Sequence, residues 1–155
     1  MKRNAFTMLE LVFVIVVLGI LAAVAIPKLA ATRDDAQIAK GRSDVAAIRS
    51  AIVSERQIRL LRGDSSYINQ LDDATQDLEN ETLFDNNGTA ANSILMYGIV
   101  SKDSNGHWMK DDADTYIYKV INTPISFDYN ATSGIFTCNR TASGNAGRYC
   151  KVLID

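Results

Sequence analysis

The amino-acid sequence predicts an α+β fold. In it, one long N-terminal helix spans a membrane with its first half and packs with its second half on a small antiparallel sheet. Three observations predict this arrangement. Residues 11–26 are apolar and free of charge, an amphipathic helical pattern follows them, and short alternating apolar segments occupy the C-terminal part. The length of 155 residues is that of one ordinary domain.

The apolar run at residues 6–26 is long enough to cross a membrane. A helix of this length measures roughly 31 Å, about the thickness of the hydrocarbon core. Lys2 and Arg3 precede the run, which predicts a cytoplasmic N-terminus. A cleaved signal peptide is the alternative. However, no A-x-A site closes the run, which continues through Pro27 into the amphipathic pattern. We therefore expect one retained membrane-spanning segment.

Glu10 is an acidic residue inside this apolar run. On insertion scales a carboxylate at the centre of such a helix costs about 2.5–3.5 kcal/mol, and intramembrane charges of this kind are usually functional. Hydration at the membrane edge is the alternative, because Glu10 lies near the start of the run. We expect a partner of opposite charge.

The residues around Glu10 carry a resemblance to a known family. The segment Asn4-Ala5 followed by Phe6-Thr7-Met8-Leu9-Glu10-Leu11-Val12 resembles the cleavage and methylation motif of type IV prepilins and their relatives. The resemblance is specific over about residues 4–30. It covers pilus subunits, competence pilins and the pseudopilins of type II secretion together. It implies cleavage between Ala5, where glycine is usual, and Phe6, followed by N-methylation of Phe6.

Cleavage would change the charge of the N-terminus. The loss of Lys2 and Arg3 leaves 14 basic and 18 acidic residues, a net charge of −4. The new amine at Phe6 is cationic at neutral pH. A buried carboxylate needs a paired cation, and the amine of a neighbouring subunit can pair with Glu10. We expect this pairing, with Thr7 beside it, to set the axial register of each subunit.

The resemblance implies a pilin-like architecture. The expected parts are a leader peptide at 1–5, a transmembrane and filament-core helix at 6–27, the amphipathic half of the helix at 28–62, and a globular β head at 63–155. The head contains a variable linker at 63–93 and a disulfide loop at 138–150. Gly19 and Pro27 match the family's spacing and weaken the helix. We expect the segment between them to be helical in the membrane and to stretch on assembly.

The second half of the helix has one apolar stripe, at Ile38, Val45, Ile48 and Ile52. Arginines repeat at seven along its flank, at Arg42, Arg49 and Arg56. We expect them to form a solvated or snorkelling edge, with contact to an acidic neighbour in an assembly as the alternative. Gly63 and Asp64 end the helix, and one short helix is expected near residues 67–71 of the acidic linker.

Strands are expected at 94–100, 107–110, 116–121, 125–129, 135–138 and 148–154. The alternation at 116–120 and 125–129 is typical of a sheet with one covered face. Cys138 and Cys150 are the only cysteines and lie outside the membrane in this topology. A disulfide is the default in an oxidising compartment, with free thiols as the alternative. By resemblance, such a C-terminal loop is more typical of pilus subunits than of the major secretion pseudopilin.

Two kinds of modification or ligand site are candidates. Asp111, Asp112 and Asp114 offer the hard oxygen ligands of Ca²⁺, although EF-hand spacing is absent and such clusters are usually turns. In the resembling family, major secretion pseudopilins often carry calcium in a loop between strands. Four N-x-[ST] triplets occur, at Asn80, Asn87, Asn130 and Asn139. Asn87 and Asn130 follow an aspartate by two positions, which resembles the acceptor pattern of some bacterial N-glycosylation systems; chance triplets are the alternative.

Other function classes have little support in the sequence. A net charge of −2 excludes a bulk electrostatic binder of nucleic acid. We expect no enzyme, because there is no phosphate-binding glycine loop and no zinc spacing, and the single His107 completes no catalytic set. A membrane-anchored hydrolase would need a deep pocket at His107. No cofactor other than calcium is expected.

The resemblance implies a structural subunit of a type IV pilus-like filament. Its expected partners are copies of itself, prepilin peptidase/methyltransferase, an inner-membrane assembly platform and membrane lipid. The subunit is expected in the inner membrane before assembly and in a cell-surface or periplasmic filament afterwards. The alternatives are a pseudopilin of a type II secretion system and a monomeric membrane-anchored binding module. Glu10 and the motif at Phe6 argue against the last of these.

Overall fold

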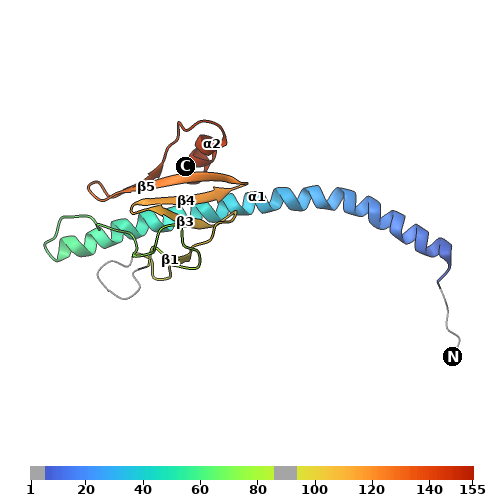
Figure 1. Cartoon of the computed structure of the whole chain (residues 1–155), viewed down its shortest axis with the longest axis horizontal. Coiled ribbons are helices and arrows are strands. Elements are labelled where there is room, and N and C mark those ends of the chain that lie inside the picture. Colours follow the sequence, from blue (N-terminus) through green and yellow to red (C-terminus); the bar gives the residue numbers. More distant parts are fainter. Residues whose placement is uncertain (1–5, 86–93) are drawn as a thin grey trace, which may run out of the picture. The chain divides into compact units, whose positions relative to one another are not determined.

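The computed structural model describes residues 6–85 and 94–155 (Figure 1). The elements of this part are α1 (Met8–Leu61), β1 (Thr82–Leu83), β2 (Ile99–Val100), β3 (Trp108–Asp112), β4 (Thr115–Val120), β5 (Thr123–Asn130), β6 (Ile135–Cys138) and α2 (Asn145–Ile154). The chain divides into two compact units, Met1–Asp35 and Ala36–Asp155. One long helix followed by antiparallel sheets confirms the predicted α+β class.

The end of α1 is set by local chemistry at Gly63. The N–H of Gly63 donates to the carbonyl of Leu60 at 3.0 Å, and the N–H of Asp64 donates to that of Arg59 at 2.9 Å. This is the Schellman arrangement, which needs a residue with positive φ after the helix. Gly63 has a φ of 84°, a conformation that glycine adopts without steric cost. The helix therefore ends where the sequence predicts.

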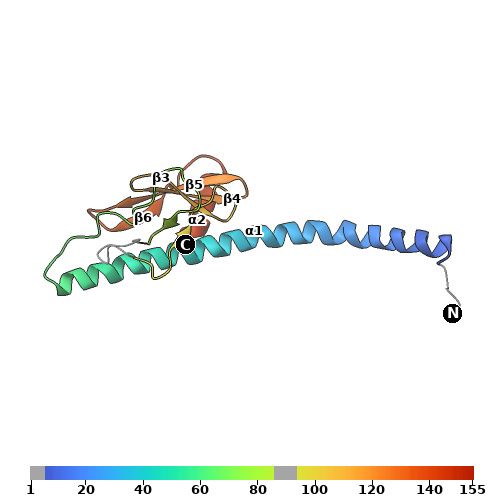
Figure 2. The ribbon, with the colours of Figure 1, turned by 60° about the horizontal axis from the view of Figure 1, so that its bottom comes forward.

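The second unit contains a four-stranded antiparallel sheet in the order β3-β4-β5-β6 (Figure 2). The side chains of β4 alternate in burial, and Tyr116, Tyr118 and Val120 are all fully buried. The predicted alternation of this strand is therefore confirmed. β1 and β2 form a separate two-stranded sheet.

The core of this unit lies between α1 and the sheet. Val45, Ile48 and Ile52 of the apolar stripe are buried, and Ile38 is partly buried against them. Opposite them is an aromatic cluster in which the rings of Phe127 and Phe136 stack at 5.3 Å. The stripe therefore has the role that the sequence predicts.

Gly41 allows a close approach of α1 to the rest of the core. A Cβ atom at this position would lie 2.4 Å from Cε1 of Tyr118 and 2.7 Å from Cδ2 of Leu153. The hydroxyl of Tyr118 donates to the carbonyl of Gln37 at 2.6 Å, one turn earlier on the helix. Any larger residue would push the helix away from β4 and α2.

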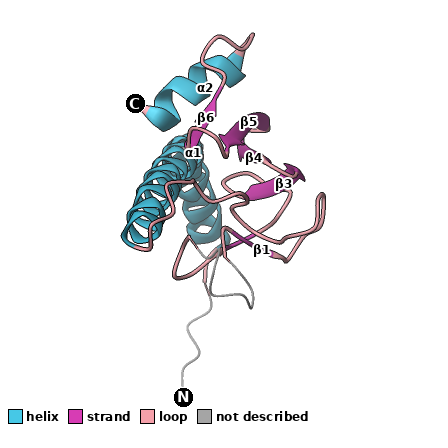
Figure 3. Ribbon diagram, turned by 90° about the vertical axis from the view of Figure 1, so that its left-hand side faces the viewer, coloured by secondary structure: helices cyan, strands magenta, loops and turns pink. Residues whose placement is uncertain are grey.

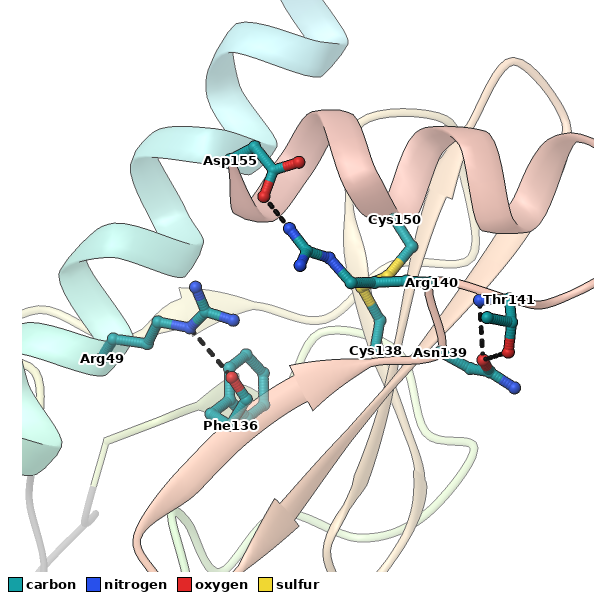
Figure 4. Close-up of a disulfide and its surroundings, with 8 residues drawn as sticks. All are labelled: Arg49, Phe136, Cys138, Asn139, Arg140, Thr141, Cys150 and Asp155. Carbon is teal, nitrogen blue, oxygen red and sulfur yellow. Dashed lines mark hydrogen bonds and ion pairs between the residues drawn. A yellow bond between two sulfur atoms is a disulfide. The ribbon is translucent and has the colours of Figure 1, made fainter.

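Each of the three repeating arginines contacts the head of its own chain, so the predicted solvated or snorkelling edge holds only in part: Arg42 is exposed, whereas Arg49 and Arg56 are partly buried. Arg42 donates from Nε to the carbonyl of Val152 at 2.5 Å. Arg49 donates from Nε to the carbonyl of Phe136 at 2.9 Å (Figure 4). The Arg56 guanidinium lies 3.7 Å from the centre of the Tyr67 ring, a cation–π contact. A seven-residue repeat places all three on one side of the helix, where they hold the head.

Asp44 and Trp108 make another polar contact between α1 and the sheet. The indole N–H of Trp108 donates to Oδ2 of Asp44 at 3.0 Å. Burial raises the pKa of Asp44, and the indole hydrogen bond partly offsets this rise. The pair orients a fully buried tryptophan against the helix.

The predicted strand at 148–154 is wrong, because this segment belongs to helix α2 (Figure 3). The buried residues of α2 are Gly147, Cys150 and Leu153, which recur every three residues as one face of a helix. The predicted disulfide is confirmed between Cys138 in β6 and Cys150 in α2 (Figure 4). The bond therefore holds a helix, and not a last strand, against the sheet.

Two further predictions, one in the linker and one just after it, are also wrong. No helix lies at residues 67–71; instead, Ile68 and Leu71 are buried in the core, and the hydroxyl of Tyr129 donates to the carbonyl of Ile68 at 2.7 Å. Of the predicted strand at 94–100, only Ile99 and Val100 pair as a strand. Core contacts, and not local propensity, determine the path of this part of the chain.

Candidate functional site

The apolar part of α1 is exposed in the single chain. Its large apolar side chains from Met8 to Leu29 have exposed fractions between 37% and 82%. Within the described residues, α1 is the one helix long and apolar enough to cross a membrane. Such a surface is unfavourable in water, so it requires lipid or other protein around it.

A capping box lies at the start of this helix. The backbone N–H and the hydroxyl of Thr7 donate to Oε2 of Glu10 at 2.8 and 2.9 Å. In return, the backbone N–H of Glu10 donates to the hydroxyl of Thr7 at 3.2 Å. This reciprocal pattern satisfies N–H groups that a helix N-terminus leaves without partners. A carboxylate there also interacts favourably with the helix dipole.

The capping box gives Glu10 a definite direction. Its carboxylate folds back to the amide of Thr7, which is bonded directly to Phe6. The carboxylate therefore lies beside the residue that would carry the new amine after cleavage. Sequence reasoning placed Thr7 next to Glu10 but missed this contact. The spacing Thr-x-x-Glu before an apolar run is the signal that predicts it.

Gly19 and Pro27 lie inside α1, which is helical through both positions. Nothing lies within 4 Å of the position of a Cβ atom on Gly19. Pro27 lacks an N–H and so removes one hydrogen bond of the helix. The helix of the single chain between Gly19 and Pro27 agrees with the expectation. The expected stretching of this segment on assembly stays a prediction.

Residues 1–26 match a family model described as the prokaryotic N-terminal methylation motif. The chain therefore carries a prepilin-type N-terminal motif. Over 51 residues it is 35% identical to type II secretion system core protein G of Pseudomonas aeruginosa, a match that covers 33% of this chain. It spans 36% of the length of that relative. No solved structure gives a significant match.

The matched residues include the start of α1. Pilins and pseudopilins, which share this motif, are structural subunits and not enzymes. The motif includes Phe6, Thr7 and Glu10, and Gly19 and Pro27 also lie in the first unit. The disulfide cysteines, the three aspartates proposed for calcium and Asn130 lie in the second unit.

Of the three aspartates proposed for calcium, Asp111 and Asp112 end β3 and Asp114 lies in the turn before β4. Oδ1 of Asp112 accepts from Nε2 of Gln76 at 3.0 Å and from the N–H of Ala113 at 2.7 Å. Asp111 is exposed, and the carbonyl of Asp114 accepts from Tyr129. Within residues 6–85 and 94–155, no group of three His, Cys, Asp or Glu side chains could hold a metal ion. Calcium binding by this chain stays a prediction.

Of the two preferred glycosylation candidates, Asn87 lies outside the described residues. Asn130 is exposed at the end of β5, and its Oδ1 accepts from the N–H groups of Thr132 and Ser133 at 2.9 and 3.1 Å. Its modification stays a prediction. His107 has Nδ1 3.0 Å from the hydroxyl of Ser104, which is a local contact within a turn.

Proposed function

We propose that this chain is a structural subunit of a type IV pilus-like filament, cleaved between Ala5 and Phe6 and assembled from the inner membrane. The observation that carries the proposal is the capping box of Thr7 and Glu10, which lies within the methylation motif and begins a wholly exposed apolar helix. In a soluble module, such a helix would expose its apolar surface to water, which is unfavourable.

The topology follows from charge and cysteine chemistry. Lys2 and Arg3 keep the N-terminus in the cytoplasm, and the apolar half of α1 crosses the membrane once. The head then lies outside the cytoplasm, where its disulfide is stable. The partners in this scheme are prepilin peptidase/methyltransferase, the inner-membrane assembly platform, membrane lipid and other copies of the chain.

Glu10 has two successive partners in the proposed assembly. In the single subunit, the capping box supplies hydrogen bonds to its carboxylate and lowers the cost of placing it in the membrane. In the filament, the Phe6 amine of a neighbouring copy supplies a full opposite charge in a medium of low dielectric. Each subunit is drawn to the depth at which this pair forms, which sets the axial register.

The second half of α1 also favours packing against other copies. Its charged residues from 40 to 59 all have partners within their own chain, as Lys40 does with the carbonyl of Gly106 at 2.6 Å. Lys40 and Arg42 remain exposed, but from residue 43 to residue 59 the exposed side chains carry no charge: Ser43, Ala46, Ala47, Ser50, Val53, Ser54, Gln57 and Ile58. A small, uncharged face allows another helix to approach closely.

A pseudopilin of a type II secretion system is the second candidate function. The similarity to core protein G favours it, whereas the C-terminal disulfide resembles pilus subunits. The two are distinguished by deletion of the gene. Loss of protein secretion with surface filaments intact supports the pseudopilin, and loss of surface filaments supports the pilus.

Mass spectrometry of purified filaments should show a mature chain that begins at N-methyl-Phe6. The reason is that the motif places the peptidase cleavage before the apolar run, which then remains in the subunit. A mature chain that begins after residue 26 would mean that the run is an ordinary signal peptide, and it would end the filament proposal.

Glu10→Ala should leave membrane insertion intact and abolish filaments, because the neighbouring amine loses its counter-charge. Removal of one partner of a buried ion pair costs about 3–5 kcal/mol per contact. Glu10→Gln is the matched control, since glutamine also serves in a capping box but carries no charge. We expect both variants to lose filaments, as measured by the yield of sheared filaments. Wild-type yield from Glu10→Gln would show that the capping contact matters and the charge does not.

A further inference from the structure

The most exposed large apolar side chains of the second unit lie in two places. Among the described residues of Ala36–Asp155, Leu61 is 90% exposed, Met96 88% and Tyr97 82%, and the next such residues reach only 55%. Leu61 ends α1, and the other two lie just before β2. Tyrosine and methionine are enriched in the centres of protein interfaces. These positions therefore indicate contact surfaces and not incomplete burial.

The segment at residues 94–98, here called the display loop, is held firmly at both ends. The N–H of Leu95 donates to the carbonyl of Phe84 at 3.1 Å. At the other end, a Cβ atom on Gly98 would lie 2.7 Å from the carbonyl oxygen of Leu83, so only glycine fits. Ile94 and Leu95 pack partly against the core. The backbone is thus fixed while Met96 and Tyr97 project into solvent.

An acidic hollow of about 250 Å³ adjoins the display loop. Its lining residues are Asp73, Ala74, Asn80, Glu81, Thr82 and Asp85. Gly98 packs directly on Thr82 and Asp85, which places the hollow beside the loop. In the described part of the chain, Asp73 and Asp85 have no side-chain partner, whereas Glu81 binds Thr75.

The hollow suits a guanidinium better than a metal ion. No three of the described acidic side chains come close enough to hold a metal. A guanidinium is planar, stays charged and spreads five N–H donors over several ångströms, so it can reach carboxylates that are too far apart for one ion. Arginine is also common at the energetic centres of interfaces.

The end of α1 offers a guanidinium next to exposed apolar side chains. Arg62 is exposed and its side chain has no partner within residues 6–85 and 94–155, unlike the charged residues of α1 from 40 to 59. It follows Leu61 directly, and Leu60 is 49% exposed beside it. This basic end, residues 60–62, matches the acidic and apolar character of the display loop and its hollow.

We infer that the basic end of one copy docks on the display loop and acidic hollow of the next copy. Leu61 packs on Met96 and Tyr97, and Arg62 binds Asp73 and Asp85. The inference rests on the proposed filament and names a contact between its heads. The two surfaces are different patches of the same molecule, so the contact is heterologous. Such contacts produce open helical assemblies when the rotation between copies does not close.

Cysteine cross-linking tests the contact in the full-length chain. Filaments of a Leu61→Cys/Tyr97→Cys variant, oxidised mildly and run on a non-reducing gel, should give a ladder of multimers. Each single variant should give none. The native cysteines do not interfere, because they form a buried disulfide. Filaments without a ladder, or a dimer from one single variant, would overturn the inference and leave the proposed function standing. A wild-type chain that forms no filaments would overturn both.

Charge reversal tests the ionic part of the contact. Arg62→Glu should lower filament yield by about tenfold or more, because like charges facing each other across an interface repel strongly. Adding Asp85→Arg to this variant should restore most of the yield. Arg148→Glu, which reverses an exposed arginine on α2, is the matched control and should leave the yield unchanged. Equal loss from Arg62→Glu and Arg148→Glu would show a general charge effect and overturn the assigned pairing.

Discussion

Lys110→Met is expected to lower the free energy of unfolding of the head by about 3–5 kcal/mol, because it leaves a buried carboxylate without its counter-charge. Nζ of Lys110 lies 2.7 Å from Oδ1 of Asp72, and the two side chains are 6% and 0% exposed. Oδ2 of Asp72 also accepts from the N–H of Phe84 at 3.0 Å. Asp72 therefore ties its part of the linker to β3 and to the residue that follows β1. Thermal or urea unfolding of the detergent-solubilised chain, followed by near-ultraviolet circular dichroism, measures the loss.

Lys119→Met is the matched control for Lys110→Met. Lys119 forms an ion pair with Asp103 in the loop between β2 and β3, but the two side chains are 27% and 59% exposed. Ion pairs that water reaches contribute about 0–1 kcal/mol. Removing both buried charges with Asp72→Asn/Lys110→Met should recover much of the lost stability. Equal effects of Lys110→Met and Lys119→Met would contradict the role assigned to the buried pair.

Replacement of both disulfide cysteines by alanine should destabilise the head by about 3 kcal/mol. The bond closes a loop between positions 12 apart and so removes freedom from the unfolded chain. The loss should appear first in α2, because Cys150 is its covalent link to the sheet. Hydrogen exchange of α2 amides should therefore accelerate more than that of β4 and β5.

Reduction of the wild-type chain provides a second measurement of the same effect. After denaturation and reduction, refolding without oxidant should give the stability of the alanine variant. Unchanged unfolding in the double alanine variant would show that packing of Leu153 against α1 suffices without the bond. Two alkylatable thiols in unreduced protein from the cell envelope would show that the bond is absent there.

The sequence alone determined the features that depend on local chemistry. The length of the apolar run and the stripe of Val45, Ile48 and Ile52 predict both halves of α1. Alternation predicts β4 and β5, since the period of a strand is two and one face is covered. The capping box of Thr7 and Glu10 is equally local, and although sequence reasoning missed it, the Thr-x-x-Glu spacing carries the signal.

Only the tertiary structure decided the features that depend on partners distant in sequence. Residues 148–154 have the β-branched and aromatic composition of a strand; the disulfide and the fit of Leu153 beside Gly41 hold them as a helix. From the sequence, the arginines spaced by seven residues could equally face water or an acidic neighbour. Only the fold places the carbonyls of Phe136 and Val152 next to two of them. Asp72 and Lys110 are 38 positions apart, and nothing local pairs them. In each case contacts between residues distant in sequence outweigh the local preference of the chain.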